Sequence, residues 1–90
     1  MQVDVYDSYA QKSDNQTIHF DVLVESRTPK EKAFEYGKRW LSTIDELPES
    51  LSQSRCNYCH TEEANQEVQK SIQEKGYYIL QMEGCPNPIS

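Results

Sequence analysis

Glycine, long apolar runs and clustered basic residues are all scarce in this sequence. Its three glycines are scattered, which excludes a glycine-rich loop of the kind that cradles phosphate groups. No stretch reaches the roughly 18 consecutive apolar residues that a membrane-spanning helix needs. The amino-terminal residues have neither a basic start nor an apolar segment, so we expect no signal peptide and a cytoplasmic protein.

Positive charge is also in short supply. Nine Lys and Arg residues stand against fifteen Asp and Glu residues, which leaves a net charge of −6 over 90 residues. An acidic chain without a basic stripe repels phosphate backbones, so we expect neither a nucleic-acid nor a membrane partner. Hydrophobic residues make up only 36% of the chain, and this thin core is compatible with a monomer or a homodimer and with an unknown protein partner.

The amino-terminal third has the alternating pattern of β-strands. Residues 2–7 are predicted to form one strand and residues 17–25 a second, separated by a polar, turn-rich segment. The apolar face of the second strand consists of Ile18, Phe20, Val22 and Val24. Its other face consists of Thr17, His19, Asp21 and Leu23. Two such strands around a polar turn predict an antiparallel hairpin.

Two helices are predicted by apolar residues at helical spacing. The first follows a cap at Thr28, has Pro29 at its first position and continues to about Ile44. Its apolar face is formed by Ala33, Gly37, Trp40, Leu41 and Ile44. The glycine in this face suggests a close approach to another part of the chain. The second helix covers residues 65–75 and ends at Gly76.

Together these elements predict a single α+β domain over residues 1–90. It would contain a small antiparallel β-hairpin plus a further strand at residues 77–82, with two helices packed on one face of the sheet. Residues 45–50 are acidic and interrupted by a proline, and we expect an irregular connection over residues 45–60, with at most a short strand at residues 51–58. A connection of this length is usually functional or held by other contacts.

Three cysteines and a histidine form the main candidate site. Cys56 and Cys59 have C-x₂-C spacing and are followed directly by His60. If the last strand runs antiparallel to the helix before it, Cys85 returns to the same end of the domain. Zinc prefers four nitrogen or sulfur ligands in a tetrahedron. The prediction is therefore a structural zinc site on Cys56, Cys59, His60 and Cys85.

Three other interpretations of these cysteines remain open. The thiols could be reduced and buried as small hydrophobic groups. They could form a redox-active pair at the C-x₂-C motif, with Cys85 as the resolving thiol. The run C-x₂-C-H is also the attachment motif of c-type haem, although attachment takes place in an exported compartment and no export signal is present. The odd number of cysteines argues against a secreted disulfide scaffold.

A second candidate site lies on the predicted hairpin. His19 and Asp21 share the face opposite the apolar residues, and Tyr6 is expected to lie across from them on the first strand. A histidine held by a carboxylate acts as an acid, a base or a metal ligand. A solvated polar face is the simpler interpretation. In a variant of the zinc prediction, His19 replaces His60 as the ligand beside the cysteines.

Several short runs resemble a family of small bacterial proteins catalogued as domain of unknown function number two thousand and twenty-four. The runs are residues 5–9 (Val-Tyr-Asp-Ser-Tyr), 19–22 (His-Phe-Asp-Val), 56–64 (Cys-Asn-Tyr-Cys-His-Thr-Glu-Glu-Ala), 76–79 (Gly-Tyr-Tyr-Ile) and 82–85 (Met-Glu-Gly-Cys). One departure is Tyr58, where the resemblance leads us to expect phenylalanine. The resemblance implies a bacterial α+β protein and no particular reaction.

No reaction can be assigned from these residues, and a non-catalytic role is favoured over an enzyme. The specific hypothesis is a zinc-binding or interaction module that uses the cysteine cluster. One alternative is a thiol redox enzyme or sensor with Cys56 or Cys59 as nucleophile. Another alternative is an interaction scaffold with inert, buried cysteines.

Overall fold

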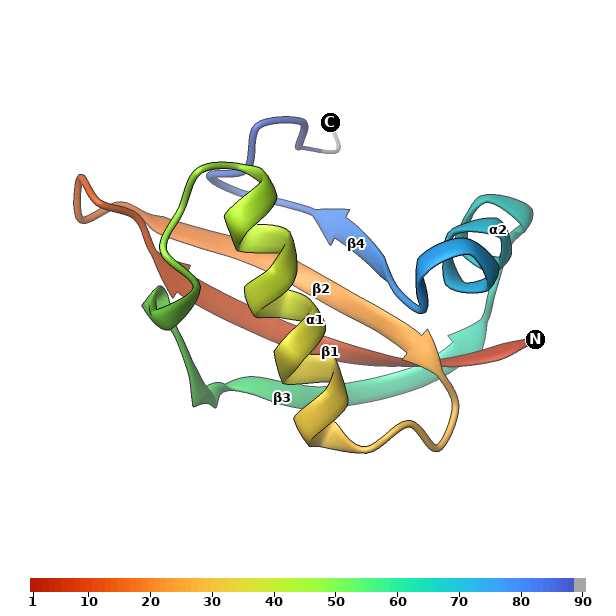
Figure 1. Ribbon diagram of the computed structural model, residues 1–90. Coiled ribbons are helices and arrows are strands. Elements are labelled where there is room, and N and C mark those ends of the chain that lie inside the picture. Colours follow the sequence, from red (N-terminus) through yellow and green to blue (C-terminus); the bar gives the residue numbers. More distant parts are fainter. Residues whose placement is uncertain (89–90) are drawn as a thin grey trace.

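Four strands form one antiparallel sheet in the computed structural model, which describes residues 1–88 (Figure 1). The elements are β1 (Gln2–Gln11), β2 (Thr17–Glu25), α1 (Lys30–Thr43), a 3₁₀ turn (Pro48–Ser50), β3 (Leu51–Glu63), α2 (Gln66–Lys75) and β4 (Tyr78–Gln81). The strand order across the sheet is β3-β1-β2-β4. This arrangement confirms the α+β class and the hairpin of β1 and β2.

The largest difference from the sequence prediction is β3. Residues 51–63 form a 13-residue strand that pairs antiparallel with β1, where an irregular connection with at most a short strand at residues 51–58 is predicted. Only Leu51 and Cys56 of this strand are buried, because β3 lies at the edge of the sheet. Its pairing with β1 is interrupted by two register irregularities. An exposed, interrupted edge strand has no apolar alternation, so the sequence pattern indicates only part of it.

Helix α1 packs on the face of the sheet formed by Phe20 and Val22. Its buried residues are four of the five predicted, Ala33, Gly37, Trp40 and Leu41, whereas the fifth, Ile44, is the C-cap residue and is only partly buried. A Cβ atom on Gly37 would lie 2.9 Å from Leu51 Cδ2, so the close approach involves side chains of the sheet. The predicted cap differs in detail. Pro29 is the N-cap residue, and the Thr28 hydroxyl donates to the Glu25 carbonyl oxygen instead of capping the helix.

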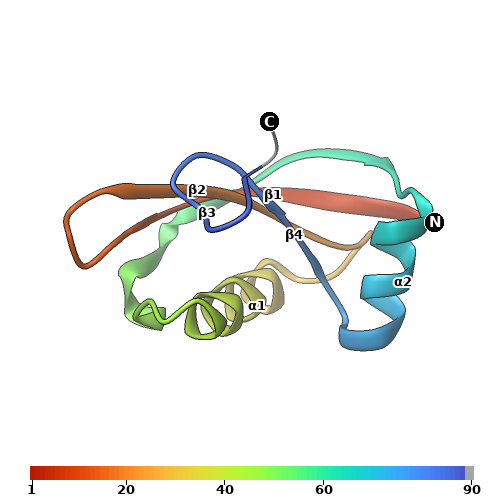
Figure 2. The same cartoon turned by 90° about the horizontal axis from the view of Figure 1, so that it is seen from above.

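Helix α2 packs against the opposite face of the sheet. Its buried residues Val68 and Ile72 cluster with Val3, Val5 and Leu23. In β2, Leu23 points away from its neighbours Val22 and Val24, because successive strand residues face opposite sides. The expected packing of both helices on one face is therefore corrected, and β4 runs between α1 and α2 in Figure 2.

The two ends of α2 match the sequence prediction. The Asn65 side chain accepts a hydrogen bond from the Val68 amide over 2.9 Å. Gly76 ends the helix with φ of +95°, a left-handed conformation that glycine adopts without a steric penalty. Within residues 1–88, no helix is both long and apolar enough to cross a membrane.

Candidate functional site

The pairing of β1 with β2 creates a polar cluster on the sheet face that points away from α1. Asp7 lies directly opposite Asp21, and Tyr9 lies opposite His19. Because every second strand residue shares a face, all four side chains project to the same side. Tyr6 does not belong to this group. It pairs with Val22 and is buried in the core beneath α1, which corrects its predicted place beside His19.

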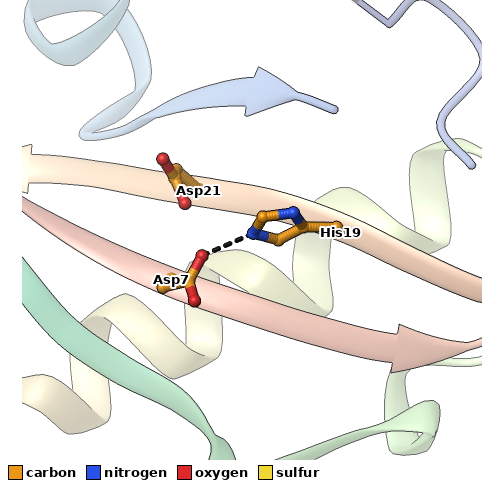
Figure 3. A group of neighbouring side chains, drawn as sticks. All are labelled: Asp7, His19 and Asp21. Atoms are coloured by element: carbon orange, nitrogen blue, oxygen red, sulfur yellow. Dashed lines mark hydrogen bonds and ion pairs between the residues drawn. The ribbon is translucent and has the colours of Figure 1, made fainter. Parts of the chain in front are cut away.

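Asp7, His19 and Asp21 converge at the centre of this face. His19 Nε2 lies 2.5 Å from Asp7 Oδ1, and the His19 ring stacks on Tyr9 with ring centroids 4.3 Å apart. Figure 3 shows Asp7 on β1 and the other two residues on β2, with α1 behind the strands. One ligand atom from each residue lies within 4.8 Å of the others. The three side chains are therefore close enough to contact one shared ion.

Asp21 has an unusual environment for a carboxylate. Its residue is only 8% exposed, and its buried Oδ1 has no hydrogen-bond partner among the described residues. Burial raises the pKa of Asp21 to about 6, and the neighbouring Asp7 carboxylate adds to this shift, while His19 and His60 oppose it. A buried carboxylate oxygen without a partner is costly, so this position favours either a proton or a cation.

The donor set fits a divalent metal ion. Imidazole nitrogen suits zinc and iron, whereas carboxylate oxygen suits zinc, manganese and magnesium. Zinc with three protein ligands retains an open position for water or a substrate oxygen, in contrast to a closed four-ligand structural site. The His19 and Asp7 side chains remain 25% and 36% exposed, so this position would be reachable from solvent.

Comparison with known proteins identifies the family of the chain. A family profile described as "Domain of unknown function (DUF2024)" matches residues 1–82. The chain belongs to the DUF2024 family. This confirms the resemblance noted in the sequence, and the matched residues include Asp7, His19 and Asp21 but end before Cys85.

A solved structure supports the fold of this DUF2024 domain. The NMR structure of protein NE1680 from Nitrosomonas europaea, a structural genomics target, is 42% identical, with a TM-score of 0.82. The match covers 94% of this chain and 99% of that one. No curated protein matches the chain. The comparisons therefore establish a family and a fold, and they assign no reaction.

The DUF2024 domain does not bring the predicted zinc ligands together. Cys56 and Cys59 lie on β3, where three residues of extended chain span about 10 Å. Cys56 points into the core beneath α1, whereas Cys59 is exposed at a register irregularity. Among the His, Cys, Asp and Glu residues of the described range 1–88, Asp7, His19 and Asp21 form the only group of three whose ligand atoms lie close enough to share an ion. The predicted Cys56, Cys59, His60 and Cys85 site is therefore corrected.

The remaining members of that prediction occupy separate places. Cys85 is buried beside β2 and donates from Sγ to the His19 carbonyl oxygen over 3.3 Å, so it meets the backbone of His19 and not its ring. His60 pairs with Glu62, with Nε2 and Oε1 2.6 Å apart. Burial raises the pKa of the Cys56 and Cys85 thiols, which makes both of them poor nucleophiles.

Sequence reasoning found His19 and Asp21 but missed Asp7 and Tyr9. The first strand was predicted to end at residue 7, whereas β1 continues to Gln11. A strand of that length pairs with residues 17–25 so that Asp7 faces Asp21. The signal for the longer strand is the alternation of Ser8 and Ala10 with Tyr9 and Gln11. This signal is weak because the buried side chains, Ser8 and Ala10, are small.

Proposed function

We propose that this protein binds a divalent metal ion, with zinc as the preferred ion, on Asp7, His19 and Asp21. The observation that carries the proposal is the buried, unpartnered Oδ1 of Asp21 beside two other ligand atoms. A cation would supply the missing partner and offset the repulsion between the two carboxylates. Three protein ligands leave the ion accessible, so the bound metal would be available to a further ligand.

The surroundings support the roles of the individual ligands. Asp21 would provide the buried anchor, and Asp7 the more exposed carboxylate on the neighbouring strand. The Tyr9 ring stacks on the His19 ring at an interplanar angle of 6°, which holds the imidazole in a fixed plane. All three ligands lie on the paired strands β1 and β2, so little chain entropy would be lost on binding.

The test is calorimetric titration of zinc into chelator-treated protein at pH 7. The background variant is Cys59→Ser, which removes the exposed thiol as a competing ligand. One zinc per chain is expected. Asp21→Asn keeps the shape of the side chain and should weaken binding more than the roughly 10–100-fold that follows loss of an outer-shell partner.

His60→Gln provides the matched control. His60 and Glu62 are also a histidine–carboxylate pair, but they form no three-residue cluster within residues 1–88. This variant should retain the zinc affinity of the background protein within about twofold, since no coordinating group is lost. The proposal is wrong if the background protein binds no zinc, or if Asp21→Asn and His60→Gln have equal effects.

A further inference from the structure

We propose that a cavity beside the metal cluster binds the oxyanion group of a small ligand, a phosphate or a carboxylate, with Arg55 as its principal contact. This inference goes beyond the proposed function and does not depend on it. The cavity has a volume of about 280 Å³ and lies between the hairpin and the start of β3. Its lining includes Tyr9, Thr17, Ser50, Ser52 and Arg55.

The cavity exists because the pairing of β3 with β1 is interrupted. Leu51 pairs with Ala10 and Cys56 pairs with Ser8, so residues 52–55 of β3 lie opposite Tyr9 alone. The additional residues cannot all join the ladder, and the chain bulges away from the sheet. Bulges often redirect side chains toward a binding site. Here the interruption brings Ser52 and Arg55 to the same cavity as Tyr9.

Arg55 presents a guanidinium group without a protein counterion. Its Cζ lies 5.2 Å from the centroid of the Tyr9 ring, and this cation–π contact orients the side chain. Among residues 1–88, no carboxylate forms an ion pair with it, and its side chain makes no hydrogen bond. Its N–H groups are therefore free to form paired hydrogen bonds with a carboxylate or phosphate.

Hydroxyl groups complete the donor set around the cavity. The buried Oγ of Ser50 has no hydrogen-bond partner in the described part of the chain. Ser52 Oγ lies 3.1 Å from Ser54 Oγ, and the Thr17 side chain contributes a third hydroxyl to the lining. A hydroxyl can donate to an anionic oxygen at little cost. Ser50 also lines the adjoining cavity that contains Glu46 and Glu49, so it lies at the boundary between the two cavities.

The local charge also favours an anion here, although the whole chain is acidic. Four other cavities of the molecule are each lined by at least one glutamate, and two of them adjoin this cavity. The two adjoining cavities contain Glu46 with Glu49, and Glu83, and the two others contain Glu31 and again Glu46. The described lining of the Arg55 cavity contains no carboxylate. Arg55 is the charged residue of this lining, although the chain as a whole has a net charge of −6.

Tyr9 connects this cavity with the metal cluster. One face of its ring meets the Arg55 guanidinium, and the ring also stacks on the His19 imidazole at 4.3 Å. Tyr9 and Thr17 additionally line the cavity of about 580 Å³ that reaches His19. A small molecule with an oxyanion at Arg55 would therefore lie next to the metal cluster on the same sheet face.

The test is an NMR titration of chelator-treated, metal-free protein with inorganic phosphate and, separately, with acetate, at constant ionic strength. Saturable shifts of the amide signals of Tyr9, Ser52 and Arg55 are expected for at least one anion. Arg55→Gln should weaken that binding at least about tenfold, because the charge-assisted hydrogen bonds are lost. Stronger binding of phosphate than of acetate, or the reverse, identifies the oxyanion class.

Arg39→Gln is the matched control. Arg39 is an exposed arginine of α1 whose Cζ lies 5.4 Å above the Tyr36 ring, so it reproduces the cation–π contact away from the cavity. Its loss should leave anion binding unchanged. Shifts that never saturate, or equal effects of the two arginine variants, would overturn the proposal. Because metal is absent throughout, these results are independent of the zinc titration.

Discussion

Asp21 is the residue whose environment departs furthest from that of an ordinary surface carboxylate. It lies on a central strand, is almost fully buried and faces a second carboxylate across the β1–β2 pair. Its pKa of about 6 follows mainly from burial. In the metal-free protein it therefore takes up a proton a little below neutral pH, whereas a bound cation would displace that proton.

This shift predicts a pH-dependent stability that disappears in Asp21→Asn. The folded-state pKa of about 6 exceeds the ordinary value of 3.8, so the folded chain binds the proton more tightly than the unfolded chain. The stabilisation that comes from proton binding by Asp21 is complete below about pH 4 and is lost as the pH rises through about 6. The free energy of unfolding of the native protein should fall, relative to Asp21→Asn, by on the order of 2 kcal/mol between these limits.

Urea unfolding of both proteins at a series of pH values, in the presence of a chelator, measures this difference. Comparing the two proteins removes the contributions of carboxylates distant from Asp21, so the remaining difference belongs to Asp21 together with its neighbour Asp7. Parallel stability curves for the native protein and Asp21→Asn would show that Asp21 titrates normally, and the argument from its burial would fail.

At the scale of elements, the packing of helix α1 on the sheet depends on the absence of a side chain at Gly37. Gly37 lies over Leu51, Val22 and Phe20. A Cβ atom added to Gly37 would lie 2.9 Å from Leu51 Cδ2, which is closer than an ordinary van der Waals contact. The atom in the way is the end of a flexible side chain, so a small displacement can accommodate one methyl group. Larger groups would have to move α1 away from the sheet.

We therefore expect effects of different size from two substitutions at Gly37. Gly37→Ala should change the free energy of unfolding by less than about 1 kcal/mol, because the gain in helix propensity offsets the contact with Leu51. Gly37→Val should destabilise the protein by about 1–3 kcal/mol through overpacking. Urea unfolding measures both. Glu35→Val, at an exposed position of α1, gives the combined cost of valine's lower helix propensity and of the lost Glu35–Lys38 ion pair, without overpacking. A Gly37→Val loss no larger than that of Glu35→Val would contradict the packing argument.

At the scale of the whole molecule, the sheet separates two apolar clusters of unequal size. The cluster beneath α1 contains Phe20, whose ring lies 4.8 Å from that of Trp40 between centroids. The cluster beneath α2 is smaller and contains the buried Ile72. The first cluster should therefore contribute most of the stability of this small domain.

Large-to-small substitutions in the two clusters should show this difference. Phe20→Ala is expected to cost about 3–5 kcal/mol. Ile72→Ala is expected to cost about 2 kcal/mol, because Ile72 is smaller than Phe20 and lies in the smaller cluster. Urea unfolding followed by both Trp40 fluorescence and far-ultraviolet circular dichroism measures the two losses. Coincident transitions would indicate one cooperative unit. An Ile72→Ala loss as large as that of Phe20→Ala would contradict the ranking.

Much of the fold follows from local patterns in the sequence. The alternation in residues 17–25, the helical spacing of Ala33, Gly37, Trp40 and Leu41, and the caps of α2 all act over a few residues, so they could be recognised without the tertiary structure. Leu23 was the one apolar residue of β2 on its otherwise polar face. It already carried the information that a second element covers that face, although the pattern does not say which.

The candidate site needed information that no local pattern contains. Asp7 meets Asp21 only because the register of β1 against β2 aligns them, and Arg55 reaches Tyr9 only because β3 pairs with β1 across a bulge. The C-x₂-C motif shows the same limit. On a turn, Cys56 and Cys59 would converge on an ion, but the long-range pairing of β3 extends them along a strand and separates them. Short-range propensity therefore determined the elements, whereas strand pairing between distant residues decided which side chains meet, because those hydrogen bonds form only in the folded sheet.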